Sequence, residues 1–131
     1  MGRDVDNDAF DTGACDNLNF ILKEDPKAMI VVSSSWRKGR SLEELKKILQ
    51  DNGIDPNRVI GKTHDSLRDI RGREISKWIL DNIKDIEGYV ILDDDSDMLP
   101  KQQNNFIKIG RQEGLTMLDA IQALKILRSP F

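Results

Sequence analysis

The stretch best suited to chemistry is a run of acidic residues that directly follows a short apolar segment. Residues 89–92 (Tyr-Val-Ile-Leu) are typical of a buried strand, and aspartates stand at positions 93, 94, 95 and 97. Like charges this close repel one another, and burying them is costly unless a positive group compensates. Carboxylate oxygens are also the ligands that Mg²⁺ prefers. The pattern therefore predicts a divalent cation at the end of a strand, with a solvated acidic turn as the alternative.

A second polar stretch follows another predicted strand. Residues 28–32 are apolar and β-branched, and Ser-Ser-Ser-Trp-Arg occupies positions 33–37. In open parallel α/β sheets, ligands bind beyond the carboxyl ends of the strands. Hydroxyl groups and backbone amides at such a place can donate to phosphate oxygens, and an arginine near position 71 can neutralise phosphate charge. The two stretches together indicate a phosphoryl site, although a serine run after a strand is also common in simple turns.

Strands and helices alternate around these stretches. Further strands are predicted at 58–60 and 106–109, and helices at 14–22, 42–52, 75–83 and 117–127. Ser41 and Glu44 form a capping box for the second helix, Gly53 suits its C-cap, and Thr116 caps the last helix. The apolar face predicted for that last helix contains residues 117, 120, 121, 124 and 127. This order favours one α/β domain over residues 1–131, with a parallel sheet covered by helices on both faces.

Composition excludes several classes of protein. The 131 residues carry 38% hydrophobic and 33% charged side chains, as expected for a globular chain, and the net charge of -3 argues against general nucleic-acid binding. Cys15 is the only cysteine, so no internal disulfide can form. No apolar run is long enough to span a membrane, and residues 1–10 are expected to be a flexible acidic N-terminus. These features predict a cytoplasmic protein without membrane contacts.

The motifs taken together resemble the haloacid dehalogenase (HAD) superfamily. The order is strand, Ser-Ser-Ser-Trp-Arg, capped helix, Ile-Gly-Lys-Thr at 60–63, Arg-Gly-Arg-Glu-Ile at 71–75, then the strand with its acidic cluster and Gly-Leu-Thr at 114–116. The chain looks most like small, nearly capless phosphatase-type members related to RNA-repair and polynucleotide 3′-phosphatase domains. The resemblance runs from about Phe10 to Leu127. It implies a three-layer, Rossmann-like fold with magnesium as cofactor.

The resemblance also assigns roles to individual residues. Phosphate-binding roles fall on Ser34, with Ser33 as the less favoured choice, and on Arg71, with Lys62 as the other candidate for the basic residue. The magnesium ligands implied are Asp93 and Asp94, supported by Asp97.

One family motif is missing from its expected place. The family begins with an apolar strand that ends in Asp-x-Asp, the nucleophile and the general acid/base, and this strand is central in the sheet. Asp4 and Asp6 match the Asp-x-Asp pattern, but only three residues precede Asp4, too few for the strand. They are therefore at best a displaced substitute for the family motif. With that strand missing, we expect a sheet of about four strands in which residues 28–32 lie beside residues 89–92.

Two functions follow from this pattern. The first is a magnesium-dependent phosphomonoester hydrolase of the HAD type, acting on a phosphorylated small molecule or a nucleic-acid end if the nucleophile is supplied. The alternative is a catalytically inactive HAD-fold protein with a binding or regulatory role, because a covalent phosphatase needs its attacking carboxylate. An incomplete sheet would also expose strand edges, which favours pairing with another chain or with a second copy.

Overall fold

Helices and strands alternate along the chain, as the sequence predicts. The structure is a computed structural model that describes residues 12–33, 39–63 and 69–129. Its helices are α1 (Thr12–Glu24), α2 (Leu42–Asp51), α3 (Arg71–Asp81) and α4 (Met117–Leu127), with short 3₁₀ turns η3 (Pro56–Arg58), η4 (Ile83–Asp85) and η5 (Pro100–Asn105). Its strands are β1 (Ile30–Val32), β2 (Val59–Lys62), β3 (Ile91–Asp93) and β4 (Phe106–Lys108). Each predicted strand is present, at most two residues from its predicted start.

The predicted helix caps are present. The hydroxyl of Ser41 accepts from the N–H of Glu44 at 3.1 Å, and the N–H of Ser41 donates to the Glu44 carboxylate at 2.7 Å. Thr116 caps α4 through the same reciprocal pair of hydrogen bonds, with Asp119 as its partner. Gly53 has a φ of 86°, which is the left-handed conformation that glycine adopts without strain. These local signals therefore define where α2 ends and where both helices begin.

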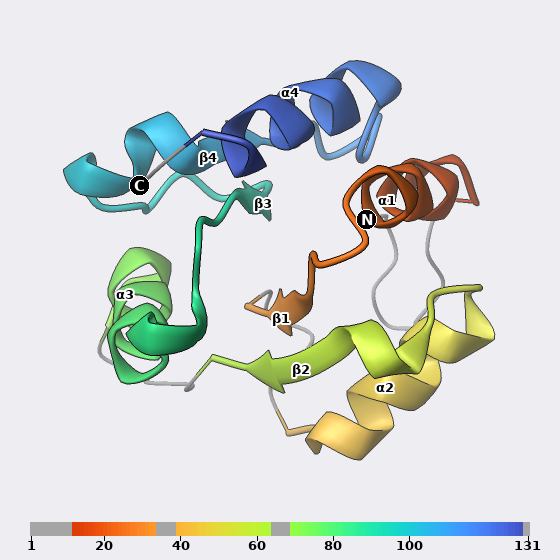
Figure 1. Cartoon of the computed structure of the whole chain (residues 1–131), viewed down its shortest axis with the longest axis horizontal. Coiled ribbons are helices and arrows are strands. Elements are labelled where there is room, and N and C mark those ends of the chain that lie inside the picture. The colour runs from red at the N-terminus through yellow and green to blue at the C-terminus, as the bar shows by residue number, and fades with distance from the viewer. Residues whose placement is uncertain (1–11, 34–38, 64–68, 130–131) are drawn as a thin grey trace.

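The strands form two separate parallel sheets. β1 pairs with β2, and β3 pairs with β4, where Asp93 lies opposite Lys108. The predicted single sheet of four strands, with β1 beside β3, is therefore wrong for the described residues. Figure 1 shows β1 and β2 lying apart from β3 and β4. We refer to the missing β1–β3 pairing as the interruption.

Helix α1 packs on both sheets across the interruption. Its residues Cys15, Leu18 and Leu22 belong to the core of the β1–β2 sheet. Its neighbouring residues Phe20 and Ile21 pack into the core of the β3–β4 sheet together with α4. A helix with its side chains is about 10–12 Å wide, whereas paired strands lie only about 4.8 Å apart. Because the helix is about twice as wide as the strand spacing, α1 can pack on both sheets while β1 and β3 remain unpaired.

The β3–β4 sheet is covered on both faces. Val90, Leu92 and Ile107 pack against α1 and α4 on one side. Ile91 packs against Ile75 of α3 on the other side, because neighbouring residues of a strand point to opposite faces. This half of the molecule therefore has the predicted order of helix, sheet and helix. Asp93, two residues after Ile91, lies on the α3 face.

The β1–β2 sheet has one well-covered face. Ile30, Val32 and Val59 pack against α1 and α2. On the opposite side, Met29 and Ile60 are exposed. The alternation of the strands thus places apolar side chains on a face that the described helices leave open.

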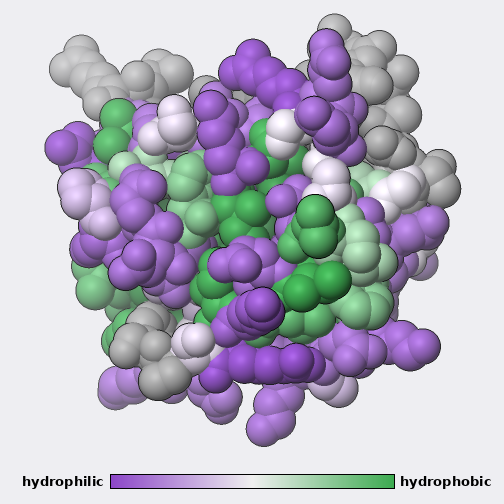
Figure 2. Space-filling model, turned by 90° about the horizontal axis from the view of Figure 1, so that it is seen from above, coloured by the Kyte–Doolittle hydropathy of each residue, from purple (hydrophilic) through white to green (hydrophobic). Residues whose placement is uncertain are grey.

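Helix α4 buries a narrower face than its sequence predicts. Ala120, Ala123 and Leu124 are buried against α1, whereas Met117 and Ile121 are exposed, so the prediction for those two residues is wrong. The small side chains of the two alanines let α1 approach closely, which leaves the larger residues outside. Figure 2 shows the surface of the molecule from above α4, where apolar side chains gather in the middle and hydrophilic side chains surround them. None of the helices in the described ranges is long and apolar enough to cross a membrane.

Candidate functional site

The acidic cluster begins at the carboxyl end of β3. Asp93 is the last residue of the strand and is buried, with a side chain only 3% exposed. Its backbone carbonyl accepts from the N–H of Ile109, which extends the pairing with β4. Because Asp93 shares the face of Ile91, its carboxylate is directed to the N-terminal end of α3 rather than to solvent. The strand alternation predicted from the sequence thus determines which helix the carboxylate meets.

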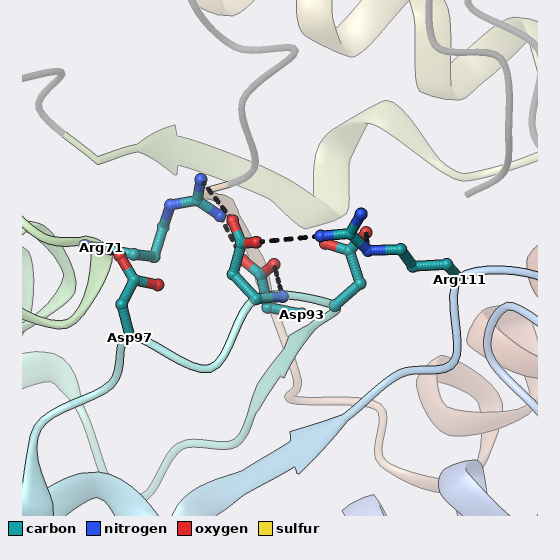
Figure 3. A network of polar contacts seen from close by, with 6 residues as sticks. Arg71, Asp93, Asp97 and Arg111 are labelled. Atoms are coloured by element: carbon teal, nitrogen blue, oxygen red, sulfur yellow. Dashed lines mark hydrogen bonds and ion pairs between the residues drawn. The ribbon is translucent and has the colours of Figure 1, made fainter.

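Arg71, the first residue of α3, neutralises this carboxylate. One terminal nitrogen of its guanidinium donates to Asp93 Oδ2 at 2.5 Å, and the other lies 3.3 Å from Asp95 Oδ2. The Arg71 side chain is only 10% exposed, so the pair with Asp93 is largely shielded from water. Figure 3 shows Arg71 reaching over the end of β3 toward the cluster. The structure therefore brings the predicted basic residue and the predicted metal ligands together.

Asp97 acts at the N-terminus of α3. Helix α3 has no side-chain cap of its own at Ile70. The carboxylate of Asp97 instead accepts from the N–H of Arg71 at 3.0 Å, and its carbonyl accepts from the N–H of Gly72 at 3.1 Å. An acceptor and a negative charge at this end stabilise a helix. Asp97 thereby holds the start of α3, and with it Arg71, against the loop after β3.

Gly72 is what allows α3 to approach this loop so closely. A Cβ at that position would lie 2.7 Å from the backbone nitrogen of Leu99 and 2.8 Å from the side-chain oxygen of Gln102. Gln102 is fully buried, and its amide nitrogen donates to the Gly72 carbonyl at 2.9 Å. The contact therefore requires the absence of a side chain, and it sets the position of the neighbouring Arg71.

Asp94 and Asp95 extend the cluster toward solvent, where a second arginine meets them. The Nε of Arg111 lies 3.5 Å from Asp94 Oδ2, and one of its terminal nitrogens lies 3.6 Å from Asp95 Oδ1. Asp95 thus contacts Arg71 through one oxygen and Arg111 through the other. Arg111 follows β4, and the carboxyl ends of parallel neighbours meet at one edge of the sheet.

Burial and hydrogen bonding have opposite effects on the pKa of Asp93. Removal from water raises the pKa of Asp93, because the charged form loses its hydration. The N–H of Asp95, which donates to Asp93 Oδ1 at 3.0 Å, and the Arg71 guanidinium both favour the charged form. The carboxylate is therefore held in place from two sides within the protein.

The cluster has a donor set that fits a divalent cation. Asp93, Asp94 and Asp95 each offer a carboxylate oxygen, and these oxygens lie within 4.8 Å of one another. Ligands of octahedral Mg²⁺ lie about 2.0–2.1 Å from the ion, so opposite ligands are about 4.2 Å apart. A small closure of the carboxylates would therefore suffice. The third member of this group is Asp95, whereas Asp97 contacts α3.

Two of the other residues predicted to bind phosphate, Ser33 and Lys62, lie at the β1–β2 sheet. Ser33 directly follows β1 and is half-buried, while Ser34 lies outside the described residues. Lys62 ends β2, and its ammonium group donates to the carbonyl of Arg40 at 2.6 Å, toward the start of α2. Of the predicted basic residues, Arg71 is thus the one in contact with the acidic cluster. Asp4 and Asp6 also lie outside the described residues.

Two members of the site were not identified from the sequence. Asp95 was part of the acidic run but was given no role, and Arg111 was not singled out. A signal for Arg111 did exist, because it stands just after the predicted strand at 106–109. Strand order alone would have placed it near the cluster once β3 and β4 were taken as neighbours.

Comparison with known proteins identifies the family of the chain. A search of curated proteins and a search of solved structures each returned no match. A sequence model of the family described as "HAD domain in Swiss Army Knife RNA repair proteins" matches residues 1–120, which is most of the chain. The chain therefore belongs to this family of HAD domains, as its motifs indicated.

Proposed function

We propose that the chain is a phosphohydrolase-type domain that hydrolyses phosphomonoesters with the help of Mg²⁺. The observation that carries this proposal is the contact between Arg71 and the carboxylates of Asp93 and Asp95 at the end of β3. A cation site beside a buried guanidinium suits a group that carries several negative oxygens, such as a phosphate. Membership in the HAD family supports the same reaction class.

The roles divide among the residues of the cluster. Asp93, Asp94 and Asp95 would hold the cation, which supplies charge neutralisation at a phosphoryl oxygen. Arg71 orients the most buried carboxylate, and Asp97 anchors the backbone of Arg71. Ser33, which directly follows β1 in the neighbouring sheet, and Ser34 are the proposed hydroxyl donors to the phosphate.

We propose that the attacking carboxylate is carried by a further strand that lies between β1 and β3. β1 and β3 are the strands on either side of it, and within the described residues each pairs with one neighbour. A strand placed there would present its carboxyl end between Ser33 and Asp93. Asp4 and Asp6, another part of the protein, a partner chain or a second copy are the candidate sources.

The reaction is tested with purified protein, Mg²⁺ and two substrates. An aryl phosphate reports general phosphatase activity, and an oligoribonucleotide with a 3′-phosphate tests the substrate class that the family's description suggests. We expect Asp94→Asn to lower the rate by at least about 100-fold, because it removes a carboxylate from the cation site. Asp51→Asn, on the exposed end of α2, is the matched control and should leave the rate unchanged.

A second function, phosphate or nucleic-acid-end binding without catalysis, is favoured by one specific observation. Both oxygens of Asp93 already accept hydrogen bonds from the protein, so the carboxylate is compensated without a cation. No turnover with Mg²⁺ or Mn²⁺ on either substrate would contradict hydrolysis for this chain. Turnover that Asp4→Asn abolishes would contradict the binding-only function and identify the nucleophile.

A further inference from the structure

The two arginines at the acidic cluster differ sharply in how firmly they are held. Arg71 is 10% exposed and makes a close contact with Asp93, whose side chain is 3% exposed. Arg111 is 75% exposed and lies 3.5–3.6 Å from its partners, which are themselves about half exposed. Exposed ion pairs contribute little to stability, whereas breaking a buried pair leaves an uncompensated charge. Only Arg111 can therefore leave the cluster easily.

The backbone that carries Arg111 is held independently of the ion pair. Residues 110–114 form a tight turn, closed by a bridge between Gly110 and Gly114. The N–H of Gly114 donates to the Gly110 carbonyl at 2.9 Å, and Gly114 has a φ of 65°. Arg111 can thus swing away by rotating its own side chain, without any change in the turn or in β4.

Arg111 and a divalent cation would use the same oxygens. The guanidinium contacts Asp94 and Asp95, which are the two more exposed members of the group that fits Mg²⁺. A cation among these carboxylates repels the guanidinium and removes its attraction to them. We propose that Arg111 is a displaceable counter-ion, which compensates the carboxylates without metal and leaves them when a divalent cation binds. This inference rests on the metal site of the proposed function.

The competition has a measurable consequence for metal affinity. Without Arg111, the cation no longer has to displace a positive group, so Mg²⁺ binds more tightly. We expect Arg111→Gln to lower the dissociation constant for Mg²⁺ by about three- to tenfold. Arg111→Lys keeps the charge and should remain within about twofold of the wild type. Arg128→Gln, which removes an exposed arginine at the end of α4, is the matched control and should leave the dissociation constant for Mg²⁺ unchanged.

The experiment is a calorimetric titration of the full chain with MgCl₂, with circular dichroism to check that each variant is folded. A second cycle repeats Arg111→Gln in the Asp94→Asn background, where its effect on the dissociation constant should be smaller because one of the two contacts of Arg111 is already lost. Arg111, Asp94 and Arg128 are all exposed, so loss of folding is unexpected for these variants.

The outcomes separate this inference from the proposed function. An unchanged or weaker Mg²⁺ affinity in Arg111→Gln, together with weakening by Asp94→Asn, overturns the counter-ion role and leaves the metal site standing. Tighter binding in Arg111→Gln without any turnover supports the counter-ion role and contradicts hydrolysis. Failure of the wild type and Arg111→Gln to bind Mg²⁺ contradicts both.

Discussion

At the scale of single residues, the site depends on one buried ion pair. Arg71 and Asp93 come from different elements, and both are shielded from water. Such a pair adds little net stability compared with apolar residues, but removing one member leaves a charge without compensation. The main role of the pair is therefore to fix the position of the Asp93 carboxylate.

Replacing Arg71 should be costly. Arg71→Met leaves the Asp93 carboxylate buried and without its guanidinium partner, so we expect a loss of about 3–5 kcal/mol in the free energy of unfolding. Urea denaturation followed by circular dichroism measures this loss. Arg73→Met, two residues along on the exposed side of α3, should cost less than about 1 kcal/mol. Equal losses in the two variants would show that Asp93 is solvated.

The cap supplied by Asp97 gives a second prediction. Asp97→Ala removes the acceptor for the N–H of Arg71 and should lower stability by about 1 kcal/mol. Asp97→Asn keeps an acceptor and should lose much less. Thermal melting compares the two variants, and a calorimetric Mg²⁺ titration shows whether Asp97 also affects the cation site. An Asp97→Ala variant as stable as the wild type would contradict the capping role.

At the scale of elements, the close approach of α3 to the loop after β3 is the feature that places Arg71. Gly72→Ala should lower stability by about 1–3 kcal/mol, because the added methyl group would overlap backbone and side-chain atoms of Leu99 and Gln102. This sign is opposite to the gain of up to about 1 kcal/mol that alanine brings in an open helix. Gly88→Ala is the control, since its Cβ would make only ordinary contacts at 3.5 Å. A stabilised Gly72→Ala would mean that α3 can move aside.

The capping box of α2 predicts a pH dependence. Hydrogen bonds from the N–H and hydroxyl of Ser41 lower the pKa of Glu44 below its usual 4.5. A lowered pKa means that Glu44 stabilises the fold above about pH 4.5 and that this contribution is lost as the pH falls further. Glu44→Gln should therefore reduce the melting temperature at pH 7 and differ less from the wild type near pH 3. Glu43→Gln, outside the capping box, should show a smaller difference at pH 7.

The elements themselves were largely predictable from the sequence, and their lateral order was not. Ser41 with Glu44, Gly53 and Thr116 are local signals, because capping involves residues that lie three positions apart or fewer. The acidic run at 93–97 was likewise visible as a candidate cation site. Whether β1 pairs with β3 depends instead on contacts between segments far apart in the sequence, and no local pattern contains that information. The contact of Arg111 with the cluster depends on the β3–β4 pairing for the same reason.

At the scale of the whole molecule, α1 joins two cores through adjacent residues. Ile21 belongs to the core with α4 and β3, and Leu22 to the core with α2 and β1. Ile21→Ala and Leu22→Ala should each cost about 2–5 kcal/mol. Hydrogen exchange should show reduced protection in both sheets for either variant, because the helix couples them. Leu118→Ala, at an exposed position of α4, is the control. Loss of protection in only one sheet would show that the halves unfold separately.

The packing of α1 on both sheets also affects how a further strand could join them. Because α1 packs on both sheets and on α4, the two strand edges at the interruption are ordered before any strand arrives. Association then has to order only the incoming segment, and this preorganisation lowers the entropic cost of docking. The rate of such an encounter would be set by diffusion and orientation rather than by refolding of the chain. A strand could thus enter and leave while the rest of the molecule stays folded.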